Sequence, residues 1–180
     1  MIKKLLLLFI LTVSLATSVS QIKYQDQLFG GTLGFWAKGS TPIFGANYEF
    51  QLPPAGMGTI GIGGMVRYWT YTEKYQNNDQ RDFTVFMASG QLNYNFNQLG
   101  QGKFVPFIGI VTGFQNVNAK YTSFTNTNII AYDTEYKSGF LVWLQGGARY
   151  FFSKKIAGVA RLGLGNLDFS TLELGVDYKF

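Results

Sequence analysis

The chain of 180 residues contains no cysteine, no histidine and only 4 prolines. The absence of cysteine excludes a disulfide framework, a thiol nucleophile and thiolate metal sites. The absence of histidine removes the commonest general base and the commonest zinc ligand. Charged residues are sparse at 14%, whereas 17% of the residues are aromatic and 22 are glycine. Because aromatics favour strands and glycine favours tight turns, this composition indicates a β-protein.

The N-terminus has the composition of a secretory signal peptide. Lys3 and Lys4 precede an apolar run over residues 5–11, and small and hydroxyl residues follow as far as Ser20. This order of basic, apolar and small residues predicts a signal peptide over residues 1–20, cleaved after Ser20 or alternatively after Ala16. An uncleaved anchor is the other reading, but the apolar run is shorter than the roughly 20 residues that a membrane span needs.

The remaining chain, residues 21–180, has the length of a single domain. Removal of Lys3 and Lys4 with the leader leaves 13 basic and 10 acidic residues, a net charge of +3. Because the basic residues are scattered rather than clustered, the charge predicts no nucleic-acid partner.

Alternation of apolar and polar residues is the recurring pattern of this domain. In the last ten residues every even position is apolar, from Leu172 to Phe180, and no odd position is. Such a period of two predicts a strand with one apolar and one polar face. Seven further segments alternate in the same way: 28–36, 43–51, 59–72, 82–96, 103–119, 134–151 and 155–164.

The connections between these eight segments alternate in length. Short turns are expected at 53–56, 97–102 and 152–155, whereas the longest polar connections are Tyr75–Arg81 and Tyr121–Ile129. Short turns at one rim and longer loops at the other are typical of outer-membrane barrels. The sequence therefore predicts an all-β fold, an eight-stranded antiparallel up-and-down transmembrane β-barrel preceded by a cleaved signal peptide.

Alternation alone does not decide which face of the barrel is wet, since a soluble lipocalin-like barrel that binds an apolar ligand also alternates. Three observations favour lipid outside. The polar face carries charges of nearly balanced sign, glycines recur on it, and aromatic residues gather near the strand ends. The aromatic residues are Phe35, Tyr48, Phe50, Tyr68, Tyr94, Phe96, Tyr150, Tyr178 and Phe180.

The terminal strand, Leu172-x-Leu174-x-Val176-x-Tyr178-x-Phe180, resembles the strand that outer-membrane barrels present to the barrel assembly machinery. The segment from Phe107 to Phe114, with Pro106 ahead of it, resembles the central strand of small barrels. The whole domain is thus similar to the outer-membrane protein β-barrel domain family, relatives of the OmpA transmembrane domain and the opacity-type proteins. The resemblance implies the outer membrane of a Gram-negative bacterium, with Tyr178 and Phe180 as assembly signal. The family's enzymes rely on a histidine at the catalytic rim, and this chain has none.

The polar-face charges form the candidate site. They are expected either to pair as a plug of a narrow lumen or to line an ion path. The interior of an eight-stranded barrel is about filled by side chains, which favours the plug. The charged residues are Glu49, Arg67, Arg149, Arg161, Glu173, Asp177 and Lys179. Trp36, Trp69 and Trp143 lie on or near the same face, as lumen filler or rim residues.

The expected function is that of a non-enzymatic, monomeric outer-membrane barrel without cofactor or metal. It contributes to envelope structure or makes surface contacts through its longer loops. Its expected partners are outer-membrane lipid and the barrel assembly machinery. The alternatives are a narrow channel for ions or small solutes and the soluble lipocalin-like barrel.

Overall fold

The computed structural model describes residues 22–36, 41–74, 80–97, 103–122, 138–165 and 170–180. The signal peptide expected over residues 1–20 lies outside these residues. So does most of each of the two long connections expected at 75–81 and 121–129.

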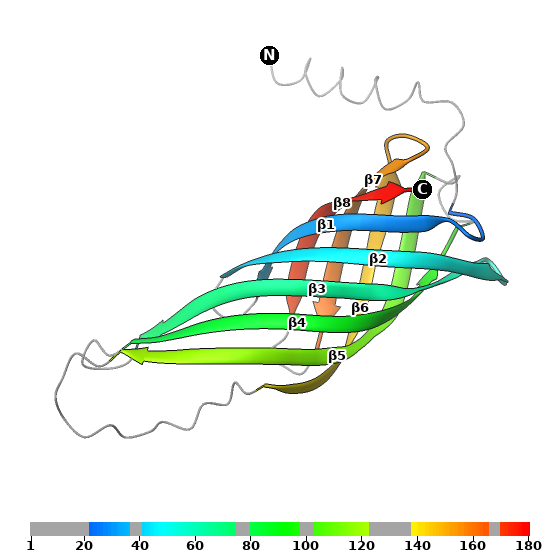
Figure 1. Ribbon diagram of the computed structural model, residues 1–180. Helices are drawn as coiled ribbons and strands as arrows, with labels where there is room; N and C mark the ends of the chain where they lie inside the picture. The colour runs from blue at the N-terminus through cyan, green and yellow to red at the C-terminus, as the bar shows by residue number, and fades with distance from the viewer. Residues whose placement is uncertain (1–21, 37–40, 75–79, 98–102, 123–137, 166–169) are drawn as a thin grey trace, which may run out of the picture.

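Within the described residues the chain forms eight strands, and each pairs antiparallel with its neighbours in sequence (Figure 1). The prediction of eight strands is confirmed. The strands are β1 (Gln27–Trp36), β2 (Thr41–Ala55), β3 (Gly58–Lys74), β4 (Gln80–Asn95), β5 (Phe104–Thr122), β6 (Gly139–Phe151), β7 (Ile156–Leu164) and β8 (Thr171–Lys179).

Pairing of β1 with β8 closes the sheet into a barrel. The two strands are in register from Leu28 opposite Lys179 to Trp36 opposite Thr171, and the backbone N–H of Phe180 donates to the carbonyl of Gln27 at 3.0 Å. A closed sheet has no edge strand whose backbone groups lack partners.

The wall of the barrel is uneven in height. Strands β3, β4 and β5 have 17, 16 and 19 residues, whereas β7 and β8 have 9 each. The extra length lies at the rim opposite the C-terminus, where the three long strands run beyond the rest of the barrel (Figure 1).

The turn expected at residues 53–56 is wrong in its placement. Strand β2 continues through Pro53 and Pro54 to Ala55, with a register shift between Gln51 and Pro54, and the chain turns at Gly56, whose φ is +62°. The pairing of β1 with β2 ends at Phe50, so the prolines lie where only β3 is a neighbour. A proline, which lacks an N–H, is tolerated where one side of the strand is unpaired.

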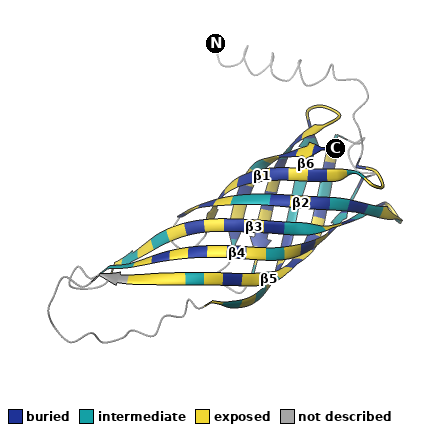
Figure 2. Ribbon diagram, in the orientation of Figure 1, coloured by how far each residue is buried: buried dark blue, intermediate teal, exposed yellow. Residues whose placement is uncertain are grey.

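The apolar face of the strands points outward, as expected for lipid outside. Buried and exposed residues alternate along the strands (Figure 2), and the large exposed side chains are apolar, for example Leu33, Ile108 and Leu174. In the described parts of the strands, the only charged residues at outward positions are Lys74, Asp82 and Lys120, all on the extensions of β3, β4 and β5. This arrangement is the reverse of a soluble barrel, whose apolar side chains face inward.

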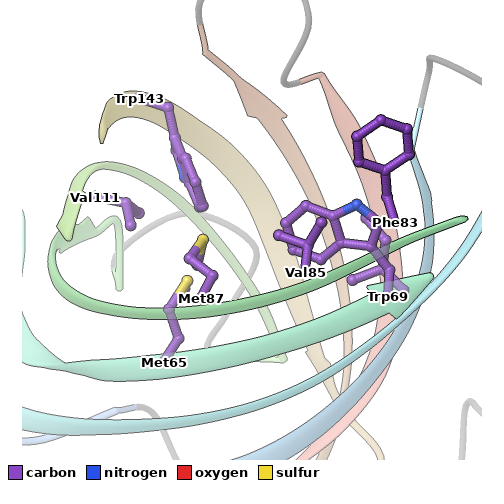
Figure 3. Close-up of a cluster of buried hydrophobic side chains, with 8 residues drawn as sticks. Met65, Trp69, Phe83, Val85, Met87, Val111 and Trp143 are labelled. Carbon is purple, nitrogen blue, oxygen red and sulfur yellow. The ribbon is translucent and has the colours of Figure 1, made fainter. Parts of the chain in front are cut away.

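The interior contains a hydrophobic cluster that the sequence analysis did not predict, because it assigned the apolar residues other than the three tryptophans to the outer face. The cluster fills the lumen toward the loop end and includes Trp69 and Trp143, which were expected as lumen filler or rim residues (Figure 3). Its buried members are Ile43, Met65, Trp69, Phe83, Val85, Met87, Val111 and Trp143. The side chain of Trp36 is outside the described set.

A second, smaller cluster lies at the end of the lumen where β1 begins and β8 ends. It consists of Ile22, Leu28, Val105, Phe151 and Ala157. Apolar side chains therefore close both ends of a polar middle section.

Replacement of wall glycines by alanine tests how tightly neighbouring strands pack against each other. A Cβ at Gly63 would meet the backbone of Tyr48 and Glu49 on β2, whereas nothing lies within 4 Å of the Cβ position at Gly139. We expect Gly63→Ala to lower the free energy of unfolding by about 1–3 kcal/mol, the usual effect of overpacking. Gly139→Ala is the matched control, with a change of at most about 0.5 kcal/mol. Urea unfolding of the detergent-refolded protein measures both, and equal midpoints for the two variants would contradict this packing.

Candidate functional site

Arg149 on β6 is the centre of the polar section of the lumen. Its side chain is fully buried, and each of its three nitrogens donates a hydrogen bond at 2.7 Å. Nε bonds Asp177 Oδ2 on β8, Nη2 bonds Glu49 Oε2 on β2, and Nη1 bonds Asn95 Oδ1 on β4. One guanidinium thus ties four strands together across the lumen.

Glu49 is hydrogen-bonded on both carboxylate oxygens. Oε1 accepts from Gln51 Nε2 and Asn95 Nδ2, both at 2.8 Å, and Oε2 accepts from Asn93 Nδ2 at 2.7 Å in addition to Arg149. Buried charge is stabilised only when it is paired and hydrogen-bonded in this way. The result is a continuous bonded layer across the barrel.

A second charged group lies nearer the loop end, around Glu173 on β8. Arg67 on β3 approaches Glu173 Oε1 with Nε at 2.7 Å and Nη2 at 2.6 Å. The hydroxyls of Thr171 and Thr32 also donate to this carboxylate, at 3.2 and 3.1 Å. Arg161 on β7 lies farther away, with Nη1 3.8 Å from Glu173 Oε2.

Six of the seven predicted lumen charges therefore lie in two adjacent groups, Arg149–Glu49–Asp177 and Arg67–Arg161–Glu173. Lys179 lies inward as expected, but it does not belong to either group. Its Nζ bonds Asp26 Oδ2 at 3.0 Å, ahead of β1 at the end of the barrel where β8 ends. Sequence reasoning missed Asp26 because this residue lies before the alternating segment.

Inward-facing glycines make room for the buried carboxylates. A Cβ at Gly61 would meet the carboxyl group of Glu49, one at Gly30 would meet that of Asp177, and one at Gly34 would meet the side chain of Glu173. These three glycines thus have a definite role, since each lies beside a buried carboxylate side chain of a neighbouring strand.

All three buried guanidinium groups also lie over aromatic rings, that of Arg161 with its Cζ 5.9 Å from the ring centroid of Phe107. Arg149 Cζ is 4.6 Å from the ring centroid of Phe107, and Arg67 Cζ is 4.8 Å from that of Trp143. Such contacts are stabilising when the cation is desolvated. They connect the charged groups to the apolar side chains above and below them.

The hydrogen bonds and ion pairs fix the positions of the buried arginine and carboxylate side chains. Among the described residues there is no metal site. There, no group of three or more histidine, cysteine, aspartate or glutamate residues is placed to hold an ion. In the same part of the chain, no helix has the length and apolar character to cross a membrane.

Comparison with solved structures places this architecture among known barrels. The outer membrane protein OprG from Pseudomonas aeruginosa superposes with a TM-score of 0.67 at 10% identity, over 91% of this chain and 99% of that one. The N-terminal β-barrel domain of OprF from the same organism gives 0.58 at 14%, over 88% and 100%. Ail, the attachment invasion locus protein of Yersinia pestis, gives 0.55 at 14%, also over 88% and 100%.

The fold is that of the small outer-membrane barrels. No family model and no curated protein matches the sequence, so the likeness is one of architecture. It agrees with the resemblance noted in the terminal strand.

In such a barrel the C-terminal strand closes the wall, and here its last aromatic residues point outward. Tyr178 and Phe180 are 38% and 66% exposed and stack edge to face, with ring centroids 5.0 Å apart. Tyr94 with Phe96 and Tyr150 with Phe152 form similar pairs on β4 and β6. The role of Tyr178 and Phe180 as an assembly signal stays a prediction.

Removal of Arg149 tests the charged layer. We expect Arg149→Met to lower the free energy of unfolding by about 3–5 kcal/mol, because Glu49 and Asp177 lose the cation they share. Adding Glu49→Gln and Asp177→Asn to this variant is expected to recover part of the loss, since the group around the former Arg149 then contains no charge. Denaturant titration in detergent measures the change.

The matched control is Lys120→Met, which removes an exposed cation from the extension of β5. A similar midpoint for Arg149→Met and Lys120→Met would show that the charged layer contributes little to stability.

Proposed function

We propose that this protein is a monomeric, non-enzymatic integral protein of the Gram-negative outer membrane. Its lumen is closed by the charged layer, and it contributes to envelope structure or makes surface contacts through the connections that follow β3 and β5. The observation that carries the proposal is the orientation of the wall, with apolar side chains outside and paired charges inside.

The dimensions of the apolar wall support a membrane location. On β4 the outward residues are apolar or small from Phe86 to Phe96. These 11 residues, tilted by about 40° with a rise of about 3.3 Å each, span roughly 28 Å, enough for an apolar band of about 25 Å. Beyond Phe86 the outward positions become polar, at Thr84 and Asp82.

Aromatic residues border this band at both ends, as in an interfacial girdle. The row on the loop side contains Phe35, Phe44, Tyr68, Phe86, Phe114 and Phe140. The row at the opposite end, where β8 ends, contains Tyr48, Phe50, Tyr94, Phe96, Phe104, Tyr150, Phe152, Tyr178 and Phe180. The outer wall of a soluble barrel faces water, where rows of exposed aromatic side chains are not expected.

The bonding of the lumen favours the plug over the narrow channel. The polar groups of Arg149, Glu49 and Asn95 bond one another rather than lining an open path. Hydrophobic side chains then fill the lumen on both sides of this layer. An ion crossing the barrel would have to break these contacts.

The membrane location predicts heat-modifiability. We expect the mature chain to require detergent for solubility, and the unboiled sample to migrate differently from the boiled one on a denaturing gel, because the closed barrel resists detergent unfolding until heated. A chain that is soluble without detergent and shows no shift would favour the lipocalin-like alternative, and ligand screening would follow.

The plug predicts a difference in conductance. We expect the wild type in planar bilayers to show little steady conductance, and Arg149→Ala to raise it severalfold, because the layer then lacks its central cation. Lys120→Ala is the control and is expected to conduct like the wild type. Steady wild-type conductance that Arg149→Ala leaves unchanged would support the narrow channel instead.

A further inference from the structure

Arg161 is a buried cation whose donors the protein leaves largely unused. Its side chain is 1% exposed, and its Nε and Nη2 donate to no acceptor in the described part of the chain. The nearest carboxylate oxygen, Glu173 Oε2, lies 3.8 Å from Nη1, beyond hydrogen-bond distance. A guanidinium group carries five N–H donors, and burying it without acceptors is strongly unfavourable.

Glu173 does not supply these acceptors, because its carboxylate is bonded to other donors and lies too far from Arg161. Arg67 Nε donates to Oε1 at 2.7 Å with Nη2 2.6 Å from the same oxygen, and Thr171 also donates to Oε1. Thr32 donates to Oε2. Arg161 is therefore the second cation beside one carboxylate, and the group Arg67–Arg161–Glu173 has a net charge of +1.

Arg149 shows that a buried arginine of this barrel can be fully bonded, whereas Arg161 lacks acceptors for two nitrogens and Arg67 for one, Nη2. Arg149 uses all three nitrogens and shares two carboxylates, those of Glu49 and Asp177. The group around Arg149 has a net charge of −1 and lies closer to the end of the barrel where β8 ends. The six charges sum to zero, with the positive excess on the loop side of the polar section.

A second unused donor lies on the same side of the lumen. Trp143 Nε1 is buried and donates to no described acceptor. It lies 3.9 Å from the Cβ position of Gly163, the next inward residue after Arg161 on β7. Glycine contributes no side chain to the lumen here, and the hydroxyl of Thr171, 2.7 Å from the same Cβ position, is a further donor close by.

We propose that Arg161, together with the indole N–H of Trp143, binds a small monovalent anion of the size of chloride inside the barrel. One negative charge brings the group to neutrality, whereas a polyvalent anion would reverse its sign. Trp143 belongs to the buried hydrophobic cluster of the lumen, and such surroundings favour a small anion over a bulky one. The anion is taken up as the barrel folds, so its binding needs no open path and is independent of whether the lumen conducts.

The test is equilibrium unfolding by urea in detergent, with chloride replaced by the bulky anion gluconate at constant ionic strength. Once chloride exceeds its dissociation constant, the folding equilibrium constant of the wild type is expected to rise about tenfold for each tenfold increase in chloride. Arg161→Met is expected to lose this dependence, and Lys120→Met to retain it. Equal stability of the wild type in both salts, or unchanged dependence in Arg161→Met, would overturn the proposal.

Arg161→Met can fail to fold, and a measurement on the wild type covers that case. Crystals grown in bromide are expected to show an anomalous peak within hydrogen-bond distance of Arg161 Nε or Nη2. Absence of that peak would mean that water alone solvates Arg161, and the proposal would be wrong.

Discussion

Every other feature of this barrel depends on the pairing of β1 with β8. A wall that presents apolar side chains outward is compatible with a bilayer only if its backbone groups are all bonded within the sheet, and an open sheet would leave one edge unpaired. Closure satisfies this condition. It also confines the polar face to an interior of fixed width, so that the charged side chains must find partners among themselves.

The interior is divided into a polar middle section, in which the charged side chains pair, and an apolar cluster at each end. Eight strands enclose a space just wide enough for side chains, and the polar middle is bounded by Ile22, Leu28 and their neighbours at one end and by the cluster around Trp69 at the other. Exclusion of water strengthens each ion pair in the middle, and it raises the penalty for any donor left without an acceptor. Arg149 and Arg161 illustrate the two outcomes within a single barrel.

Much of the fold could be predicted because a transmembrane strand repeats with a period of two. The terminal strand from Leu172 to Phe180 shows this directly, and the buried charges were found as the residues opposite the apolar face. The pairing of particular charges could not be predicted, since it depends on the registers between strands. The apolar cluster was missed because the inward positions Phe83, Val85 and Met87 are apolar and so depart from the polar inward face of the other strands, and the prolines of β2 because proline usually marks a turn.

The inward glycines have a consequence for how this sequence can change. Gly61 provides the space that the carboxyl group of Glu49 occupies, and Gly30 does the same for Asp177. The two members of each pair share one volume across neighbouring strands. A larger residue at Gly61 is therefore harmful while Glu49 is present and becomes acceptable once Glu49 is shortened. Evolution along these strands is epistatic, and the order in which substitutions arise decides which of them survive.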